Sequence, residues 1–348
     1  MNAGDARSIA ERWVAEEASR TPGEVLGAFT WGSINWMAAV EPFPASSDVD
    51  VVVVVPSVDP ERHRVRKRAY GGIVVEPFYL PRERFLSPER LLADCAVAPN
   101  LVDGTVLLDP EGLLRSVRAA ITPELARRHW VRLRCRDRRD QALSLIAAFE
   151  ASDSLAHVNA VTSNAVMAMA QMALIADLQN PTVKKALVKA HDVLASYGLA
   201  EEHRALLRLL GVANLGDEDV LAVSSHCRAA LEEACRCLRT AFPPDNHVSV
   251  HSLPALDLDV PACVREGKGR EIFLWVASLY AFAVIAILND ASEAVAAAAT
   301  QVYLADMARV GAATLAEARG RLLACRPALQ RMTDVTDDIV ARSSRTFE

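Results

Sequence analysis

The chain lacks the surplus of basic residues and the paired cysteines that mark several common classes of protein. Its 348 residues include 38 Lys and Arg against 44 Asp and Glu, which gives a net charge of −6. Binding to a long nucleic acid needs a basic surface that neutralises phosphates, so this class is excluded, whereas a nucleotide in a local basic pocket is not. The seven cysteines include no CxxC pair, so ordinary zinc-finger spacing is absent. We therefore expect free thiols and a reducing, cytoplasmic environment.

The sequence shows no leader pattern and one apolar run of borderline length for a membrane span. The N-terminus has no basic segment followed by an apolar stretch, so it predicts no signal peptide. Residues 272–288 form a run of 17 residues without a charge. This is the lower end of the roughly 17–25 residues that a membrane span requires, and the run contains Ser278. We interpret it as the buried central helix of a helical domain and expect no membrane segment.

Two parts of the chain have different patterns. In the first part we expect strands at residues 24–30, 49–55, 73–80 and 105–108, and helices at residues 6–20, 34–40 and 111–120. From about residue 123 onward Ala and Leu dominate, and Gly or Pro marks the joints between helices. The predicted fold is therefore an α/β domain with a mixed sheet over residues 1–120, followed by an α-helical domain over residues 121–348.

Two acidic residues stand at the beginning of the valine-rich strand expected at residues 49–55. Side chains alternate between the faces of a strand, so Asp48 and Asp50 point the same way. Carboxylates this close repel each other, and each raises the pKa of the other. A hard divalent cation with oxygen ligands, Mg²⁺ above all, would neutralise them. The pair therefore predicts a magnesium site at the mouth of this strand.

Three further residues suit the chemistry of a phosphate ester held near such a metal ion. Gly32 and Ser33 follow the expected first strand and precede the helix expected at residues 34–40. Glycine allows a phosphate to approach the backbone, and the serine hydroxyl and the amides of a helix N-terminus favour an anion. Glu76 lies in the next strand and completes a three-carboxylate site if the two strands are neighbours. Pro77 follows it directly, which predicts an edge position or a strand end there.

The order of these motifs resembles the nucleotidyltransferase superfamily that includes DNA polymerase β. Over about residues 20–110 the chain is most similar to the small bacterial enzymes that act on aminoglycosides and lincosamides. The resemblance implies that Gly32 and Ser33 hold a nucleoside triphosphate and that Asp48 and Asp50 bind Mg²⁺. It makes Glu76 the third acid, either as a metal ligand or as the base that activates an acceptor hydroxyl.

The activity that this resemblance implies is transfer of a nucleoside monophosphate, AMP from ATP, to a hydroxyl of a small molecule, with release of pyrophosphate. The implied acceptor is an antibiotic such as an aminoglycoside, whose positive charge the acidic surplus would suit. Two alternatives remain within the same chemistry: an intermediate of natural-product biosynthesis as acceptor, and AMP transfer to a protein by an antitoxin-type regulator. A third is a nucleotide-binding protein without turnover. Dimers are common in the family, and the sequence itself leaves the oligomeric state open.

The helical half offers basic candidates for contact with the triphosphate. Lys184 and Lys185 follow a Pro-Thr turn, and the resemblance implies that a basic residue here faces the outer phosphates. The alternative is a helix capped by Thr182 with exposed lysines. The five arginines within residues 132–139 could also meet a triphosphate, because guanidinium groups suit phosphate oxygens. The alternative is a solvated helix face.

Five more residues have both a functional and a structural interpretation. Glu150 could act as general base toward an acceptor, with Asn159 and Thr162 beside it, or these residues belong to ordinary helices. Trp31 and Trp36 flank the Gly-Ser motif and could stack on a nucleobase. The alternative for both tryptophans is packing in the core.

Overall fold

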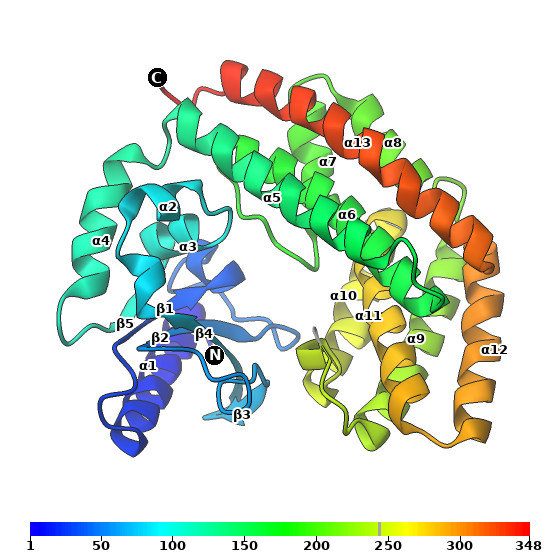
Figure 1. The fold of residues 1–348 in the computed structure, drawn as a ribbon, viewed down its shortest axis with the longest axis horizontal. Helices are drawn as coiled ribbons and strands as arrows, with labels where there is room; N and C mark the ends of the chain where they lie inside the picture. Colours follow the sequence, from blue (N-terminus) through cyan, green and yellow to red (C-terminus); the bar gives the residue numbers. More distant parts are fainter. Residues whose placement is uncertain (243–244) are drawn as a thin grey trace. The chain divides into compact units, whose positions relative to one another are not determined.

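The structure is a computed structural model that describes residues 1–242 and 245–348 (Figure 1). It divides into two compact units, one formed by Met1–Asp137 with Ser344–Glu348 and the other by Arg138–Ser343. Helix α5 (Arg128–Phe149) begins in the first unit and ends in the second. The division therefore falls inside a helix, later in the chain than the boundary drawn after residue 120 from the sequence.

The strands that the structure describes form one mixed sheet in the first unit. Their order is β3-β4-β2-β1-β5, and their bounds are β1 Gly27–Trp31, β2 Val49–Val55, β3 Arg68–Tyr70, β4 Ile73–Pro81 and β5 Val106–Leu108. β2 pairs in parallel with β4, whereas the other neighbours are antiparallel. A small five-stranded mixed sheet followed by a helical region is the fold class that the sequence predicts, so that prediction is confirmed.

The valine run of β2 is buried on both faces of the sheet. Val51 and Val53 pack on one face in a core with Ile9 and Trp13 of helix α1 (Ala3–Arg20). Val52 and Val54 pack on the other face, against the helices α2 (Pro88–Ala93), α3 (Val97–Asp103) and α4 (Leu113–Ile121). Burial on both faces explains why this strand has no polar alternation, and each buried valine contributes about 1.5–3 kcal/mol. The strand that carries Asp50 is thus the rigid centre of the unit.

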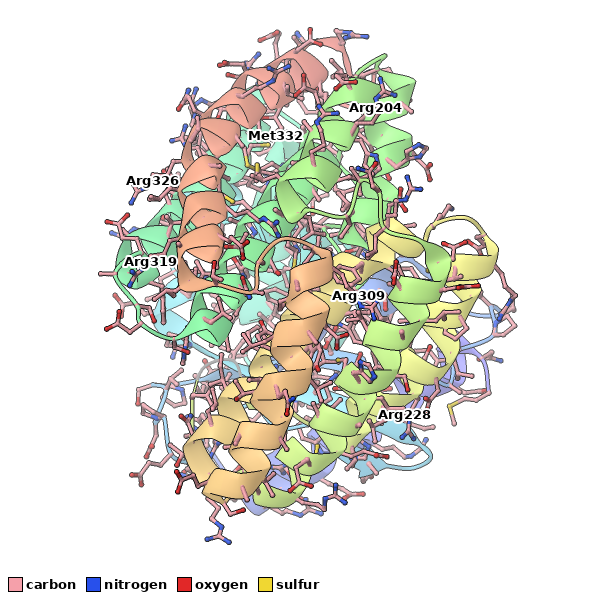
Figure 2. All side chains as sticks on the ribbon, turned by 90° about the vertical axis from the view of Figure 1, so that its right-hand side faces the viewer. Arg204, Arg228, Arg309, Arg319, Arg326 and Met332 are labelled. Carbon is pink, nitrogen blue, oxygen red and sulfur yellow. The ribbon has the colours of Figure 1, made fainter. Side chains whose placement is uncertain are left out.

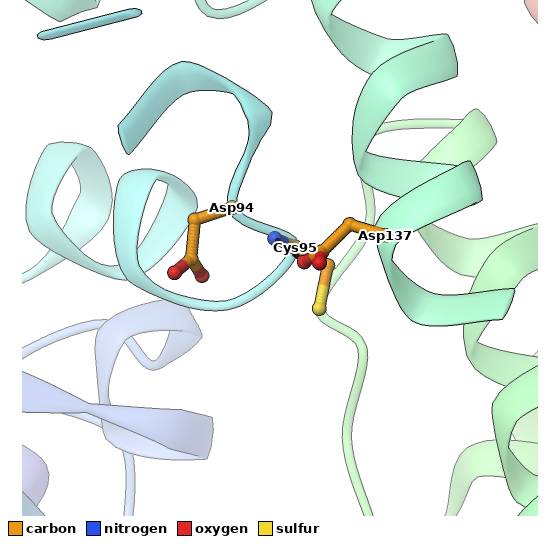
Figure 3. A group of neighbouring side chains, drawn as sticks. All are labelled: Asp94, Cys95 and Asp137. Atoms are coloured by element: carbon orange, nitrogen blue, oxygen red, sulfur yellow. Dashed lines mark hydrogen bonds between the residues drawn. The ribbon is translucent and has the colours of Figure 1, made fainter. Parts of the chain in front are cut away.

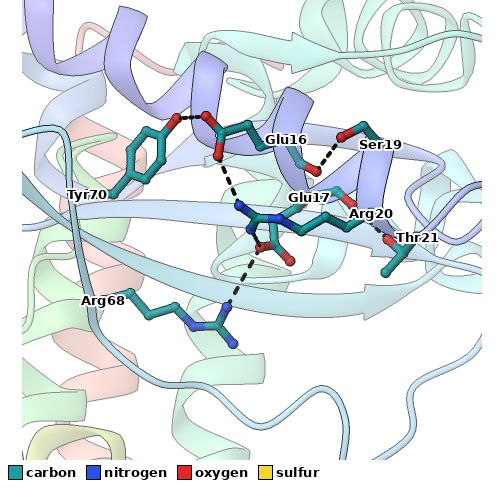
Figure 4. Close-up of polar contacts among 7 residues, drawn as sticks. All are labelled: Glu16, Glu17, Ser19, Arg20, Thr21, Arg68 and Tyr70. Carbon is teal, nitrogen blue, oxygen red and sulfur yellow. Dashed lines mark hydrogen bonds and ion pairs between the residues drawn. The ribbon is translucent and has the colours of Figure 1, made fainter.

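Contacts between the end of α1 and β3 fix the outer part of the sheet (Figure 4). The hydroxyl of Tyr70 donates to the carboxylate of Glu16, and the guanidinium of Arg68 lies 3.8 Å from the carboxylate of Glu17. The hydrogen bond with Glu16 raises the pKa of the Tyr70 hydroxyl. Helix α1 therefore contacts both ends of the three-residue strand β3.

The prediction of a helix at residues 34–40 is wrong. A 3-10 segment, Gly32–Trp36, takes its place and is followed by turns. The amide of Asn35 donates to the carbonyl of Thr30 at 3.0 Å and to the side-chain oxygen of Asn100 at 3.2 Å, so this residue folds back toward β1. These side-chain bonds compete with helical hydrogen bonds. The anion site expected from helix amides after Ser33 therefore has no α-helix behind it.

The described residues of the second unit form helices joined by turns, as the sequence predicts. After α5 come α6 Leu155–Ala176, α7 Ala186–Ser196, α8 Ala200–Leu210, α9 Asp217–Cys237, α10 Leu253–Arg265, α11 Gly269–Asp290, α12 Glu293–Arg309 and α13 Leu315–Arg342. α6 packs against α13, α11 and α7, and α11 also packs against α9. These contacts make α6 and α11 the centre of the unit.

Helices α6 and α11 are each long and apolar enough to cross a membrane by length and composition. The structure buries 94% of the apolar window of α6 and 78% of that of α11 inside the protein. A helix that is apolar on all sides and covered by other helices is typical of the core of a large helical unit. The interpretation of residues 272–288 as a buried helix is confirmed, and α6 is a second helix of the same kind.

Ion pairs within the same unit neutralise the arginines on the outside of the helical unit (Figure 2). The arginines labelled there pair with acidic residues as follows: Arg204 with Glu201, Arg228 with Asp257, Arg309 with Asp219, Arg319 with Asp153 and Arg326 with Glu150. Met332 of α13, also labelled, is buried. The positive charge of these five arginines is thus balanced locally.

Candidate functional site

Three carboxylates meet at one end of the parallel pair β2–β4. Asp50 lies in register with Glu76 of β4 on one side and with Trp31 of β1 on the other. Asp48 precedes β2 by one residue, on the same face as Asp50. One ligand oxygen from each of Asp48, Asp50 and Glu76 lies within 4.8 Å of the other two. The structure thus brings together the three acids that the sequence singled out.

Gly32 lies directly against this acidic group. Its φ is +77°, a left-handed conformation that glycine adopts without steric cost. A Cβ atom at this position would overlap a carboxylate oxygen of Asp50. The amide of Gly32 donates to the side-chain oxygen of Asn100 at 2.9 Å. The glycine is therefore required both by its backbone conformation and by the close approach of Asp50, and the neighbouring Ser33 is exposed to solvent.

Asn100 is a residue of this site that sequence reasoning missed. It lies on α3 and is buried, and its own amide donates to the carbonyl of Ala96 at 2.9 Å. Its side-chain oxygen accepts from Gly32 and from Asn35, so it holds the turn after β1 in place. The sequence gives no sign of this role, because Asn100 and Gly32 are far apart in the chain and meet only when α3 packs beside β1.

Burial and mutual repulsion dominate the electrostatics of the acidic group. Burial, and then the charges of Asp48 and Glu76, raise the pKa of Asp50 well above its usual range. Lys67 acts in the opposite direction but does not cancel these effects. Compared with a solvated aspartate, Asp50 in the folded protein is therefore shifted toward its protonated form.

Lys67 is the second residue that the sequence did not reveal. Its side chain is 10% exposed and its ammonium pairs with the carboxylate of Asp48 and lies 3.4 Å from an oxygen of Glu76. Burial alone would lower the pKa of Lys67, but the carboxylates of Asp48 and Glu76 outweigh it, and the pKa is raised. The only signal in the sequence is a basic stretch at residues 62–68, which is typical of a solvated loop.

The proline after Glu76 fits its place in the sheet. β3 pairs only with Ile73, Val74 and Val75 of β4, through Tyr70, Ala69 and Arg68. From Glu76 onward β4 has β2 as its neighbour on one side and no described strand on the other. An edge of this kind tolerates a residue without an amide hydrogen, as expected.

These residues fit a hard divalent cation. Three carboxylates supply the oxygen ligands that Mg²⁺ prefers, and a backbone without a side chain lies beside them at Gly32. The ammonium of Lys67 already lies among the acids as a stand-in cation. The chemistry of the donor set and the position of this ammonium therefore agree on a cation site.

A second group of possible ligands, Asp94, Cys95 and Asp137, has a structural explanation (Figure 3). Asp94 accepts from the amides of Ala96 and Val97 at 2.9 and 2.8 Å at the start of α3, and it pairs with Arg84. Asp137 accepts from the amide of Cys95 at 3.0 Å. The carboxylate of Asp94 therefore binds the amides at the start of α3, and that of Asp137 anchors the loop at Cys95.

The two candidate lysines belong to the second unit. Lys184 pairs with Asp259 and its ammonium lies 6.0 Å from the ring centroid of Trp275. Lys185 directly precedes α7, which has no side-chain cap, so capping by Thr182 is wrong. The role of Lys184 and Lys185 toward a triphosphate stays a prediction.

The arginine-rich segment is only in part a solvated helix face, because Arg136 is exposed and Arg134 and Arg138 are not. Arg134 is fully buried and donates to the carbonyls of Leu92 at 3.0 Å and Leu125 at 2.6 Å. Burial lowers its pKa to about 10. Arg138 donates to the side chain of Gln171 at 2.7 Å. These two arginines hold helices and loops together, which neither interpretation of the sequence foresaw.

The remaining candidates divide between core and surface. Asn159 is buried and donates to the hydroxyl of Tyr303, and Thr162 donates to a carbonyl of its own helix, so both are structural. Glu150 pairs with Arg326. Trp31 stacks on Phe78, with ring centroids 6.0 Å apart.

Trp36 differs from Trp31, because 43% of its surface is exposed. Packing in the core, the structural interpretation of both tryptophans, is therefore wrong for Trp36. The indole ring of Trp36 lies at the surface, four residues after Gly32.

Comparison with known proteins adds a distant structural similarity. No family model matches the chain, and no curated protein matches it at a significant level. Among solved structures, the chain is similar to a nucleotidyltransferase-like protein from Exiguobacterium sibiricum, with 17% identity and a TM-score of 0.27. The match covers 75% of this chain and 91% of that chain.

Proposed function

We propose that this protein is a Mg²⁺-dependent nucleotidyltransferase that moves AMP from ATP to a hydroxyl of a small molecule and releases pyrophosphate. One observation carries the proposal. The carboxylates of Asp50 and Glu76 lie in register on parallel neighbouring strands, with Asp48 beside them and Gly32 packed against Asp50. This is the order of strand, Gly-Ser, acidic pair and third acid by which the sequence resembles the nucleotidyltransferase superfamily.

Asp48, Asp50 and Glu76 would hold the metal in this proposal. When bound, Mg²⁺ would supply positive charge that stabilises the attacking and leaving oxygens.

The proposed reaction balances as a single displacement at phosphorus. The oxygen of the acceptor hydroxyl forms a bond to the α-phosphorus of ATP, and the bond from this phosphorus to the bridging oxygen of the β-phosphate breaks. The hydroxyl proton passes to a carboxylate, which is Glu76 in the alternative where this residue is the base and not a metal ligand, and pyrophosphate leaves with the bridging oxygen. Glu76 is buried and lies next to Asp50 in register, which fixes its position for this role.

Gly32 and Ser33 are the proposed contacts to the triphosphate. The absence of a side chain at Gly32 leaves the backbone open beside Asp50, and the exposed hydroxyl of Ser33 can donate to a phosphate oxygen. Lys184 and Lys185 are added only on the resemblance, as contacts to the outer phosphates.

The proposed acceptor is a hydroxylated, cationic antibiotic of the aminoglycoside kind. The net charge of −6 favours a cationic substrate, and the resemblance is greatest to enzymes that modify such compounds. An intermediate of natural-product biosynthesis and a protein hydroxyl are the alternative acceptors for the same chemistry.

Release of pyrophosphate tests this proposal directly. The protein would be incubated with Mg²⁺, each of the four nucleoside triphosphates and a panel of aminoglycosides and lincosamides, and the products would be analysed by mass spectrometry. We expect a product heavier by one AMP residue with ATP, absent with the Asp50→Asn variant. Pyrophosphate release without a modified acceptor from the panel would point to one of the alternative acceptors. An absence of nucleotide binding would contradict the proposed function.

A further inference from the structure

Lys67 lies inside the acidic group instead of at the surface, where lysine is usually found. Its ammonium contacts Asp48 and lies 3.4 Å from Glu76, and only 10% of the side chain is exposed. Both contacts are to residues that would ligate a metal ion. A cation bound by these two carboxylates and the lysine ammonium therefore compete for the same oxygens.

The backbone around Lys67 is attached to the first unit on both sides. After it, Arg68 and Tyr70 belong to β3 and contact Glu17 and Glu16 of α1 (Figure 4). Before it, the ring of His63 stacks on that of Tyr79, with centroids 4.8 Å apart. The ammonium can consequently leave the acids by rotation of its own four-carbon side chain, without unfolding of the segment.

We propose that Lys67 is a built-in competitor for the metal site. Its ammonium neutralises Asp48 and Glu76 in the metal-free protein, and a divalent cation expels it into solvent on binding. The proposal rests on the metal-binding role proposed above for the three acids. It adds that metal affinity is held down by a residue that is not itself a metal ligand and that Lys67 becomes accessible only in the metal-bound state.

The first test uses the wild-type protein and Mg²⁺ alone. The chain has only five lysines, so reductive methylation followed by mass spectrometry can follow each of them. We expect Lys67 to react slowly in EDTA and several-fold faster with saturating Mg²⁺. The four lysines of the second unit, at 184, 185, 189 and 268, serve as internal standards and should not change. An unchanged rate at Lys67 under conditions where Mg²⁺ is bound would overturn the proposal.

The second test measures affinity in matched variants. A charge-assisted hydrogen bond has a net value that corresponds to roughly ten- to hundredfold in an equilibrium constant. Lys67→Met should therefore bind Mn²⁺, counted by electron paramagnetic resonance of the free ion, about ten- to hundredfold more tightly than wild type. Lys268→Met, which removes a half-exposed lysine 3.8 Å from Glu266 in the other unit, should bind like wild type.

The outcomes separate this proposal from the proposed function. Equal affinity of Lys67→Met and wild type would overturn the competition and leave the metal site standing. No binding by either protein would overturn both. If Lys67→Met does not fold, Lys67→Arg keeps the charge at this position and should not gain affinity, and a gain in that variant would contradict the proposal.

Discussion

Substitution of Gly32 by alanine tests the geometry of the site most sharply. Alanine in the left-handed conformation that Gly32 adopts, with φ of +77°, costs about 1–2 kcal/mol. The new Cβ would also overlap a carboxylate oxygen of Asp50, so this side chain must rotate away at a cost of about 0.5–1.5 kcal/mol. We expect the free energy of unfolding to fall by about 1.5–3.5 kcal/mol in total.

The same substitution should damage the site beyond its effect on stability. Rotation of Asp50 removes one ligand from the acidic group, and a displacement of about 1 Å in a catalytic group can lower a rate by about a hundredfold. Urea denaturation would report the stability, and Mn²⁺ binding with the rate of AMP transfer would report the site.

Gly23→Ala is the matched control for this experiment. Gly23 also has a left-handed backbone, with φ of +80°, but nothing lies within 4 Å of a Cβ built on it. Gly23→Ala should lower the free energy of unfolding only by the cost of placing alanine in the left-handed conformation, about 1–2 kcal/mol, and should leave metal binding unchanged. If Gly32→Ala bound Mn²⁺ and transferred AMP like Gly23→Ala, the proposed approach of Asp50 to Gly32 would be refuted.

Three more predictions follow from individual side chains. Asp50→Asn should lower transfer by at least about a hundredfold. Because the pKa of Asp50 is raised by folding, its contribution to stability is present at low pH and lost as the pH rises through the folded-state pKa. In urea titrations in EDTA, the gain in stability of Asp50→Asn over wild type should therefore be larger at pH 8 than at pH 4. An equal difference at both pH values would contradict the assigned pKa direction. Glu76→Gln should also abolish transfer, and a normal rate would move the third acid elsewhere. Arg134→Ala should lower the free energy of unfolding by about 2–5 kcal/mol because the carbonyls of Leu92 and Leu125 lose their donor. The exposed Arg136→Ala should change it little, and equal effects would refute the structural role of Arg134.

The local patterns of the sequence were sufficient for the central strand and its acids. A run of β-branched residues at 49–55 predicts a buried strand, and period-two alternation places Asp48 and Asp50 on one face. Glu76 required one more assumption, that its strand lies beside β2, and the parallel register of Asp50 with Glu76 fulfils it. The helical half followed from composition and breakers alone.

What the sequence did not reveal depends on contacts between distant segments. Lys67 reaches Asp48 and Glu76 only after β3 has paired with β4, and a basic stretch by itself predicts solvation. The helix expected after Gly32 fails because Asn35 bonds to Asn100 across 65 residues. Arg134 is buried because carbonyls from two other segments accept from it. Periodicity and propensity carry no information about such partners.

Transfer of label from ATP tests the central claim, which is nucleotidyl transfer at the three carboxylates. The protein would be incubated with Mg²⁺ and an acceptor found in the panel, once with ATP labelled at the α-phosphate and once with ATP labelled at the γ-phosphate. The account predicts that the α-label enters the acceptor and the γ-label leaves in pyrophosphate, and that Asp50→Asn transfers neither. Entry of the γ-label into the acceptor, or its release as inorganic phosphate, would contradict it.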